Sequence, residues 1–350
     1  MLIGDDGALP LPWLAEPLAQ ALQRQRGHAL LVHGAAGSGV LPFALALAQS
    51  WLCEAADGLR PACGRCGSCR LVQGRVHPDL MLLMPEQQRR EHDWPLSGDK
   101  TEGDSSKKPS RQIRVDEVRT LIDWVFKTSA RGRGKVAVLT PGEALNLQSA
   151  NALLKTLEEP PPGTRLLITT PDPQRLLPTV RSRCQQLRLA EPAATAATAW
   201  LAERGVAEPA VLLAACAGRP LDALALHQAG VHADAWRRLP EALARGQGGA
   251  VQGWPLPQLL DLLLKLCHDA LAVAGGAAPR YFVPGTVPEG GSPERLRAWS
   301  LELQRVARHA GHPWNEGVLA DALVAGAARA LRARGPRGPS RRAGLDTLPA

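Results

Sequence analysis

The sequence contains little tyrosine or phenylalanine: one Tyr and three Phe stand against nine Trp in 350 residues. Nor do basic and aromatic residues alternate, as they do in proteins that stack the bases of single-stranded nucleic acid. We therefore expect the tryptophans to pack in apolar cores. The sequence also lacks a run of about 18 uninterrupted apolar residues, the length that a transmembrane helix needs, so we expect no membrane contact.

A secretory signal is missing as well. The first residues include Asp5 and Asp6 and carry no basic segment before an apolar stretch, which is not the pattern of a signal peptide. We therefore expect a cytoplasmic protein, in which thiols stay reduced. The net charge is +8, but six arginines and one aspartate from residue 329 onward account for +5 of it. The remaining surface is close to neutral, which does not favour general binding of nucleic acid.

Apolar runs of strand length alternate with helical patterns in the first half of the chain. Residues 28–34, 135–141 and 165–171 are short apolar runs that end in glycine or proline, as expected of buried strands. Residues 41–52 and 150–157 have the spacing of helices. Strands separated by helices predict an α/β domain with a parallel sheet and flanking helices.

The strand patterns stop near residue 190, where alanine- and leucine-rich helical patterns begin. We predict an α/β domain, a small helical domain, a larger all-helical domain and a disordered basic tail, at residues 1–190, 191–234, 235–331 and 332–350. Within the first domain, residues 86–111 hold six acids and six bases and almost no aliphatic side chain. Such a segment buries too little apolar surface to order itself, so we expect a flexible insertion.

A glycine-rich turn joins the first predicted strand to the helix that follows, and its glycines are Gly34, Gly37 and Gly39. This is the position of a phosphate-binding loop, in which a lysine and then a hydroxyl residue follow the last glycine. Val40 and Leu41 occupy those two positions and can bind neither phosphate nor Mg²⁺. Pro141 takes the place of the aspartate expected after the second strand. The sequence therefore predicts a degenerate loop, with no ATP bound or hydrolysed by this chain.

Four of the seven cysteines lie close together in the sequence: Cys53, Cys63, Cys66 and Cys69. Four thiolates complete the tetrahedral coordination of one Zn²⁺ and leave no position for water, so such a zinc would be structural. An iron–sulfur cluster is the alternative that four cysteines allow. His77 is near enough in the sequence to replace one of them, although its surroundings are more typical of the start of a strand.

Four features together resemble one family: Asn-Ala-Leu-Leu-Lys-Thr-Leu-Glu-Glu-Pro at 151–160, Arg-Ser-Arg-Cys at 181–184, His-Pro-Asp-Leu at 77–80, and the cysteine set. From about residue 11 to 224, the chain is similar to the clamp-loader branch of the AAA+ proteins, and within it to the delta-prime subunits of bacterial DNA polymerase III. The degenerate glycine loop distinguishes this subfamily from the ATP-hydrolysing gamma/tau subunits, which share the same motifs. The resemblance favours zinc at the four cysteines.

This resemblance implies an AAA+ core, a small lid and a helical collar within a ring of five subunits, a heteropentamer of the DNA polymerase III holoenzyme. The partners would be the gamma/tau and delta subunits and, through the complex, the sliding clamp and primed DNA during DNA replication. Within Ser182-Arg183-Cys184, Arg183 would be an arginine finger that completes the ATP site of a neighbouring gamma/tau subunit. The chain itself would be a stator with no intrinsic ATPase.

Positions near the finger and in the predicted lid add to this expectation. Arg181 is close enough in the sequence to support the same surface as Arg183. Thr170 falls at the first sensor position of the family, where it is either a nucleotide sensor or a core hydroxyl. Leu221 occupies the place of the second sensor arginine, and Arg219 comes two residues too early. We therefore expect no nucleotide contact from the lid.

Two other functions stay open. An ATP-hydrolysing gamma/tau-type motor would share the family motifs, but Val40, Leu41 and Pro141 argue against it. A zinc-dependent nucleic-acid-binding module would use the four cysteines and the arginine-rich tail, because basic tails bind phosphates in a salt-sensitive way. That function would leave the AAA+ motifs unexplained.

Overall fold

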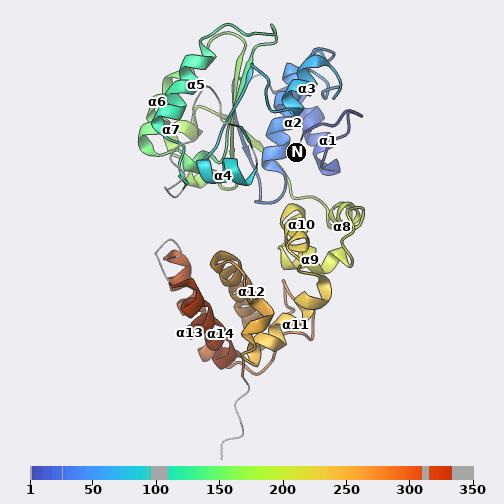
Figure 1. Cartoon of the computed structure of the whole chain (residues 1–350), viewed down its shortest axis with the longest axis vertical. Coiled ribbons are helices and arrows are strands. Elements are labelled where there is room, and N and C mark those ends of the chain that lie inside the picture. The colour runs from blue at the N-terminus through green and yellow to red at the C-terminus, as the bar shows by residue number, and fades with distance from the viewer. Residues whose placement is uncertain (1, 26, 93, 96–108, 310–314, 333–350) are drawn as a thin grey trace, which may run out of the picture. The chain divides into compact units, whose positions relative to one another are not determined.

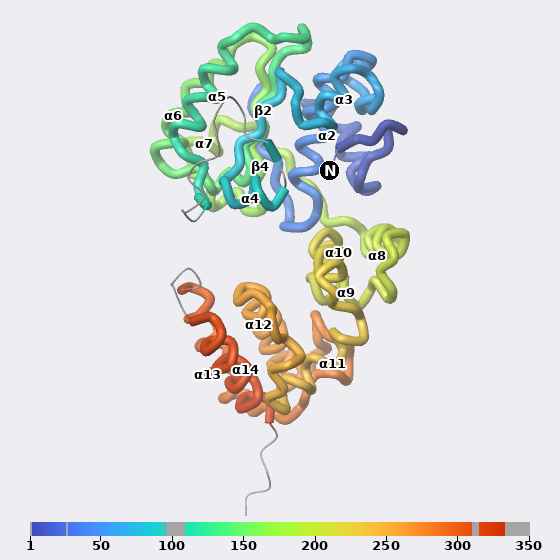
Figure 2. The backbone as a smooth tube through the Cα atoms, viewed as in Figure 1, coloured from blue at the N-terminus to red at the C-terminus, as the bar shows by residue number. Residues whose placement is uncertain are grey.

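The computed structural model describes residues 2–25, 27–92, 94–95, 109–309 and 315–332 (Figures 1 and 2). The chain forms two compact units, one of residues 1–200 with 219–222 and the other of residues 201–218 with 223–350. The division into three domains and a tail stays a prediction. Residues 333–350 of the predicted tail lie outside the described residues.

A five-stranded parallel sheet forms the centre of the first unit, in the order β2-β3-β4-β1-β5. Its strands are β1 (Ala29–His33), β2 (Leu80–Leu83), β3 (Lys135–Leu139), β4 (Thr164–Thr170) and β5 (Gln185–Arg188). Nearly every residue of β1, β3 and β4 is buried. Parallel strands that are covered on both faces have no polar alternation, which explains the continuous apolar runs in the sequence. The predicted α/β fold is confirmed.

Helices cover both faces of this sheet (Figure 1). On one face, α2 packs against β1, β3 and β4, and α1 and α3 pack against α2; on the other, α5 and α6 share a core with the sheet. The helices and 3₁₀ turns of this unit are η1 (Pro12–Leu14), α1 (Ala15–Arg24), α2 (Val40–Leu52), α3 (Gly67–Gln73), α4 (Glu86–Glu91), α5 (Val115–Val125), η2 (Gly142–Ala144), α6 (Leu147–Glu158), η3 (Pro173–Arg175) and α7 (Pro178–Arg181).

The α6 helix carries most of the Leu-Leu-Lys-Thr-Leu-Glu-Glu segment. Asn146 caps its start, since its side chain accepts a hydrogen bond from the backbone N–H of Ser149 at 2.9 Å. Leu153 and Leu157 are fully buried in the core that α6 shares with α5 and the sheet. The helix ends at Glu158, and the prolines at 160–162 cannot continue it because they lack a backbone N–H.

The polar stretch at 86–111 begins with a helix, α4, which the sequence did not lead us to expect. Its first residue, Glu86, accepts a hydrogen bond from the backbone N–H of Ser110 at 3.4 Å and pairs with Arg90 at 2.6 Å. The two ends of the stretch are therefore close together. We expected flexibility over the whole stretch at 86–111; within it, residues 93 and 96–108 lie outside the described residues.

The described part of the second unit is helical. Its helices are α8 (Ala194–Ala202) and α10 (Pro220–Gln228), which it shares with the first unit, α9 (Pro209–Ala215), α11 (Ala233–Ala244), η4 (Gly248–Val251), α12 (Leu256–Ala274), α13 (Pro293–Arg308) and α14 (Glu316–Leu331). α12 packs against α13 and α14. The buried carboxylate of Asp269, on α12, accepts hydrogen bonds from the backbone N–H groups of residues 280–282. This carboxylate fixes the segment that follows the helix.

Among the described residues, no single helix combines the length and apolar character that crossing a membrane requires. The helices α9 and α10 meet this requirement only as a pair, and they are bent by 108°.

Candidate functional site

The turn between α7 and β5 carries the three residues of the predicted finger motif, Ser182, Arg183 and Cys184. Val180, 1% exposed, anchors α7 in the core. Cys184 is turned toward the same core, and burial raises the pKa of its thiol to about 12, so the thiol stays protonated. Ser182 donates its hydroxyl to the carbonyl of Thr179 at 3.2 Å. Arg183 is thus the member of the motif that presents a charged group at the surface.

The side chain of Arg183 is 31% exposed and contacts the end of α6. Its Nε donates to Oε1 of Glu158 at 2.6 Å, and its Nη2 lies 2.5 Å from the same oxygen. Its Nη1 donates to the carbonyl oxygen of Thr179 at 2.9 Å. Arg181 turns instead toward η3, where its Nη1 donates to Oε1 of Gln174 at 2.7 Å. The two arginines therefore contact different elements.

The glycine loop follows β1 and leads into α2. Gly37 and Gly39 have φ angles of +72° and +105°, which glycine adopts without strain. Other segments lie directly against both residues: a Cβ at Gly37 would be 2.7 Å from Oδ1 of Asp222, and one at Gly39 would be 2.4 Å from Cδ1 of Leu11. The backbone N–H of Leu221 also donates to the carbonyl of Gly37 at 3.3 Å. The positions that Cβ atoms would take at Gly37 and Gly39 are therefore occupied by other side chains.

Polar side chains near this loop contact one another. Thr170, at the first sensor position, is 1% exposed, and its Oγ1 donates to Oε2 of Glu143 at 2.8 Å. Arg219, the arginine nearest to the second sensor position, pairs through Nε with Asp222 at 3.0 Å. The ion pair of Asp222 with Arg219 therefore lies against Gly37.

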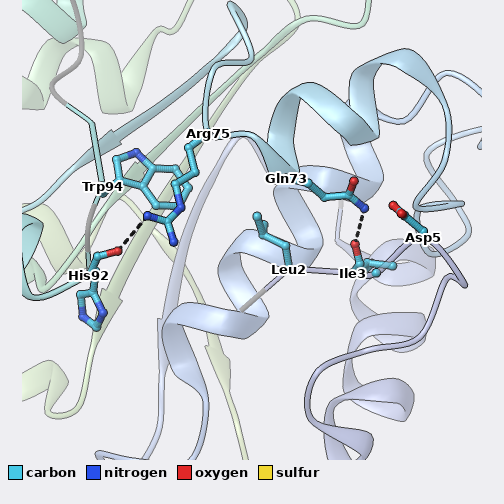
Figure 3. A pocket seen from close by; sticks show the side chains of 8 residues that line it. Leu2, Ile3, Asp5, Gln73, Arg75, His92 and Trp94 are labelled. Carbon is cyan, nitrogen blue, oxygen red and sulfur yellow. Dashed lines mark hydrogen bonds between the residues drawn. The ribbon is translucent and has the colours of Figure 1, made fainter.

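The described residues of the first unit line cavities at the glycine loop and near the end of α3. One, of about 530 Å³, lies beside the glycine loop and is lined by Gly34, Ala35, Arg188, Leu189, Ala190 and Glu191. The other, of about 500 Å³, is formed by residues before η1, the end of α3 and the segment after α4 (Figure 3). In it, the guanidinium of Arg75 lies 5.4 Å from the centre of the Trp94 ring, and its Nη1 donates to the carbonyl of His92 at 3.0 Å.

The four cysteines of the predicted metal site come together between the end of α2 and the start of α3. Their Sγ atoms all lie within 4.8 Å of one another, and Sγ of Cys53 is 3.6 Å from that of Cys63 and 3.8 Å from that of Cys66. In a tetrahedral site with metal–sulfur distances of about 2.3 Å, the sulfur atoms are about 3.8 Å apart, whereas a disulfide needs about 2.05 Å. The cluster could therefore hold a metal ion.

Backbone groups stabilise the thiolate form of one of these cysteines. The backbone N–H of Cys69 lies 3.4 Å from Sγ of Cys66 and donates to it. Burial raises the pKa of the Cys66 thiol, but hydrogen bonds from the backbone at Cys69 and Glu54 outweigh it and lower this pKa to about 6. For Cys69, burial raises the pKa of the thiol. Since metal ligation requires thiolates, a bound metal would supply the charge that keeps the buried thiol ionised.

A polar network ties the cysteine cluster to the sheet, and the sequence did not lead us to expect it. Asp79, 1% exposed, accepts hydrogen bonds from the Ser129 hydroxyl and from the backbone N–H groups of Ala130 and Arg131, at 2.8–3.0 Å. Arg131 in turn pairs with Glu54, which directly follows the first cysteine of the cluster. The connection between α5 and β3 is thereby fastened to the cluster.

His77 belongs to the same network. Its Nδ1 accepts from the backbone N–H of Asp79 at 3.0 Å, so Nε2 carries the proton, which points at the Ser68 hydroxyl 3.1 Å away. Burial lowers the pKa of this imidazole and keeps it neutral. With both ring nitrogens engaged, His77 is not available as a metal ligand. Both His77 and Asp79 belong to the His-Pro-Asp-Leu motif at 77–80, so this motif marks the network in the sequence.

A parallel sheet in the order β2-β3-β4-β1-β5, with a glycine turn after β1, defines an AAA+-type core. A family model described as DNA polymerase III, delta subunit matches residues 13–193, more than half of the chain. DNA polymerase III subunit delta' of Escherichia coli K12 is 36% identical over 307 residues, which cover 82% of this chain and 85% of that protein. The chain therefore belongs to the delta-prime family of DNA polymerase III.

Two further relatives match shorter parts of the chain. DNA polymerase III subunit delta' of Pseudomonas aeruginosa is 41% identical over 227 residues, 61% of this chain; the match spans 62% of that relative, less than two thirds of its length. DNA polymerase III subunit tau of Escherichia coli K12 is 34% identical over 162 residues, 46% of this chain and 21% of tau. The likeness to tau is thus confined to a shorter part of the chain.

Replacement of Asp79 by alanine should lower the free energy of unfolding by about 3 kcal/mol, because the buried backbone N–H groups of Ala130 and Arg131 lose their acceptor. Urea unfolding followed by circular dichroism measures the change. Asp123→Ala is the matched control, since Asp123 is an exposed carboxylate on α5, and it should change the stability by less than about 0.5 kcal/mol. Equal stability of the two variants would contradict the role given to Asp79.

Proposed function

We propose that this chain is a clamp-loader subunit of DNA polymerase III that hydrolyses no ATP and supplies Arg183 to the ATP site of a neighbouring gamma/tau subunit. Its partners would be the gamma/tau and delta subunits and, through the complex, the sliding clamp and primed DNA. Membership of the delta-prime family supports the place in the loader. The observation that carries the rest is the half-buried guanidinium of Arg183 at the turn between α7 and β5.

Arg183 has the chemistry that this role requires. In phosphoryl transfer, negative charge spreads over the equatorial oxygens, and a guanidinium delivered from outside the site stabilises it, by about 10³–10⁵ in rate in GTPases. A guanidinium has five N–H donors, and the short contacts to Glu158 and Thr179 engage three of them. Nη1 also donates to Oγ of Ser182 at 3.5 Å, and the remaining N–H of Nη2 is left for an anion on a neighbouring subunit.

The glycine loop supports a chain that binds no ATP itself. Val40 and Leu41 begin α2 where an active loop has its lysine and hydroxyl, and the Asp222 carboxylate lies against Gly37. A triphosphate would find no lysine at the start of α2, and the ion pair of Asp222 with Arg219 already lies against the loop. The alternative of a gamma/tau-type motor therefore has less support, although tau is among the relatives of this chain.

We propose zinc as the metal of the cysteine cluster. Four thiolates at tetrahedral spacing complete its coordination and leave no position for water, so the ion would stiffen the loop between α2 and α3 rather than catalyse a reaction. The alternative of a nucleic-acid-binding module has less support, because Glu54 and Ser68, beside the cysteines, are bonded to Arg131 and His77 within the domain.

Arg183→Ala should lower DNA-stimulated ATP turnover several-fold in a loader reconstituted with cognate gamma/tau, delta and the sliding clamp. The loss is partial because ATP sites that use another subunit's arginine are unaffected. Size-exclusion chromatography should show intact assembly. Arg175→Ala, which removes an exposed cation from η3, is the control and should behave as the wild type. Unchanged turnover with Arg183→Ala would rule out the finger.

The isolated chain should show no saturable, Mg²⁺-dependent binding of a fluorescent ATP analogue at micromolar concentrations. Restoring the missing side chains in a V40K and L41T double variant should not create such binding, because Asp222 remains against the loop. Fluorescence anisotropy measures both. Micromolar affinity in the wild type would instead support the motor.

Cys66→Ser should remove the bound metal and lower the thermal unfolding temperature, because a tetrahedral site loses one of its four ligands. Metal analysis of the purified protein and a thermal melt measure the two effects, and an iron–sulfur cluster would be recognised by its visible absorption. Cys216→Ser, outside the cluster, should retain the metal. Retention of zinc by Cys66→Ser, or a selective loss of DNA affinity without loss of stability, would contradict the structural role.

A further inference from the structure

The position of Glu158 does not favour the stability of its own helix. It is the last residue of α6, and a carboxylate at the carboxyl end of a helix faces the negative end of the helix dipole, which is unfavourable. Its carboxylate is half exposed, so burial does not account for it either. The contact that it does make is with Arg183, from Nε and Nη2 to one carboxylate oxygen.

The backbone that carries Glu158 is fixed on both sides. Leu157, the preceding residue, is fully buried, and its carbonyl accepts a hydrogen bond from Nε2 of His28 at 2.8 Å. Pro160 follows two residues later and ends the helix. The carboxylate therefore projects from a rigid element, which is the condition for one side chain to orient another.

The backbone that carries Arg183 is fixed as well, but its side chain is long. An arginine that is not held samples many rotamers, and fixing one of them costs conformational entropy. Glu158 holds one edge of the guanidinium, and the Thr179 carbonyl holds Nη1. These contacts select one orientation before a neighbouring subunit is present.

We propose that Glu158 is a positioning residue for Arg183: its carboxylate sets the orientation in which the guanidinium meets the phosphate of the neighbouring site. This inference rests on the proposed function of Arg183 as a finger. Glu158 touches no reacting atom. It acts by holding the donor edge formed by Nε and Nη2, so that the remaining N–H of Nη2 is presented to the partner.

The adjacent residue offers a matched control. Glu159 is exposed and follows α6 as its carboxyl-terminal cap. In the part of the chain that the structure describes, it forms no ion pair. Glu158→Ala and Glu159→Ala therefore remove the same charge from neighbouring positions, and differ in the contact with Arg183.

The test measures kcat and the KM for ATP in the reconstituted, DNA-stimulated loader. Glu158→Ala should lower kcat about two- to five-fold, the range expected for loss of a partly exposed ion pair, with the KM for ATP unchanged. Glu158→Gln, which keeps an acceptor oxygen, should give an intermediate kcat. Glu159→Ala should match the wild type. In an Arg183→Ala background, Glu158→Ala should cause no further loss, because the two residues act as one unit.

The outcomes separate this inference from the function on which it rests. If Arg183→Ala lowers turnover while Glu158→Ala matches Glu159→Ala, the positioning role is wrong and the finger stands. If Arg183→Ala leaves turnover unchanged, both are wrong. A higher kcat with Glu158→Ala would show that the carboxylate competes with the phosphate instead. Loss of assembly with Glu158→Ala alone, or a further loss in the Arg183→Ala background, would assign it a structural role.

Discussion

The parallel pairing of β1, β3 and β4 decides where the functional groups of the first unit lie. His33 at the end of β1 pairs with Thr170 at the end of β4, and Leu139 at the end of β3 pairs with Ile168. The three strands therefore end at one edge of the sheet, where ligands of open α/β folds bind. The glycine loop, the Thr170–Glu143 pair and the segment leading to α7 all begin at this edge. A change in strand register would separate them.

At the same edge, several polar side chains of the unit contact one another. The hydroxyl of Thr170 donates a hydrogen bond to the carboxylate of Glu143, and the side chain of Asp222 lies against Gly37. Buried polar groups that find partners within the chain need no ligand to offset their desolvation. Thr170, Glu143 and Asp222 therefore have partners within the unit, whereas the buried hydroxyl of Ser38, in the glycine loop, has no partner among the described residues.

The sequence was informative where the signal is local. Buried parallel strands are apolar runs, so β1, β3 and β4 could be predicted, and the spacing of Cys63, Cys66 and Cys69 indicated a metal site before any geometry was known. Contacts between distant residues left no comparable pattern. Asp79 meets Ala130 across 51 residues, and Asp222 meets Gly37 across most of the unit. In the sequence, Glu158 looks like any charged residue on the exposed face of a helix. Its contact with Arg183 joins residues 25 positions apart and is visible only in the structure.

The local backbone conformation favours glycine at positions 37 and 39. Their positive φ angles and the atoms packed against them leave no room for a side chain. An alanine at either place would be strained by the positive φ angle, and Asp222 and Arg219, or Leu11, would have to shift to admit its Cβ. The spacing of these glycines therefore follows from the path of the backbone and does not by itself identify a ligand.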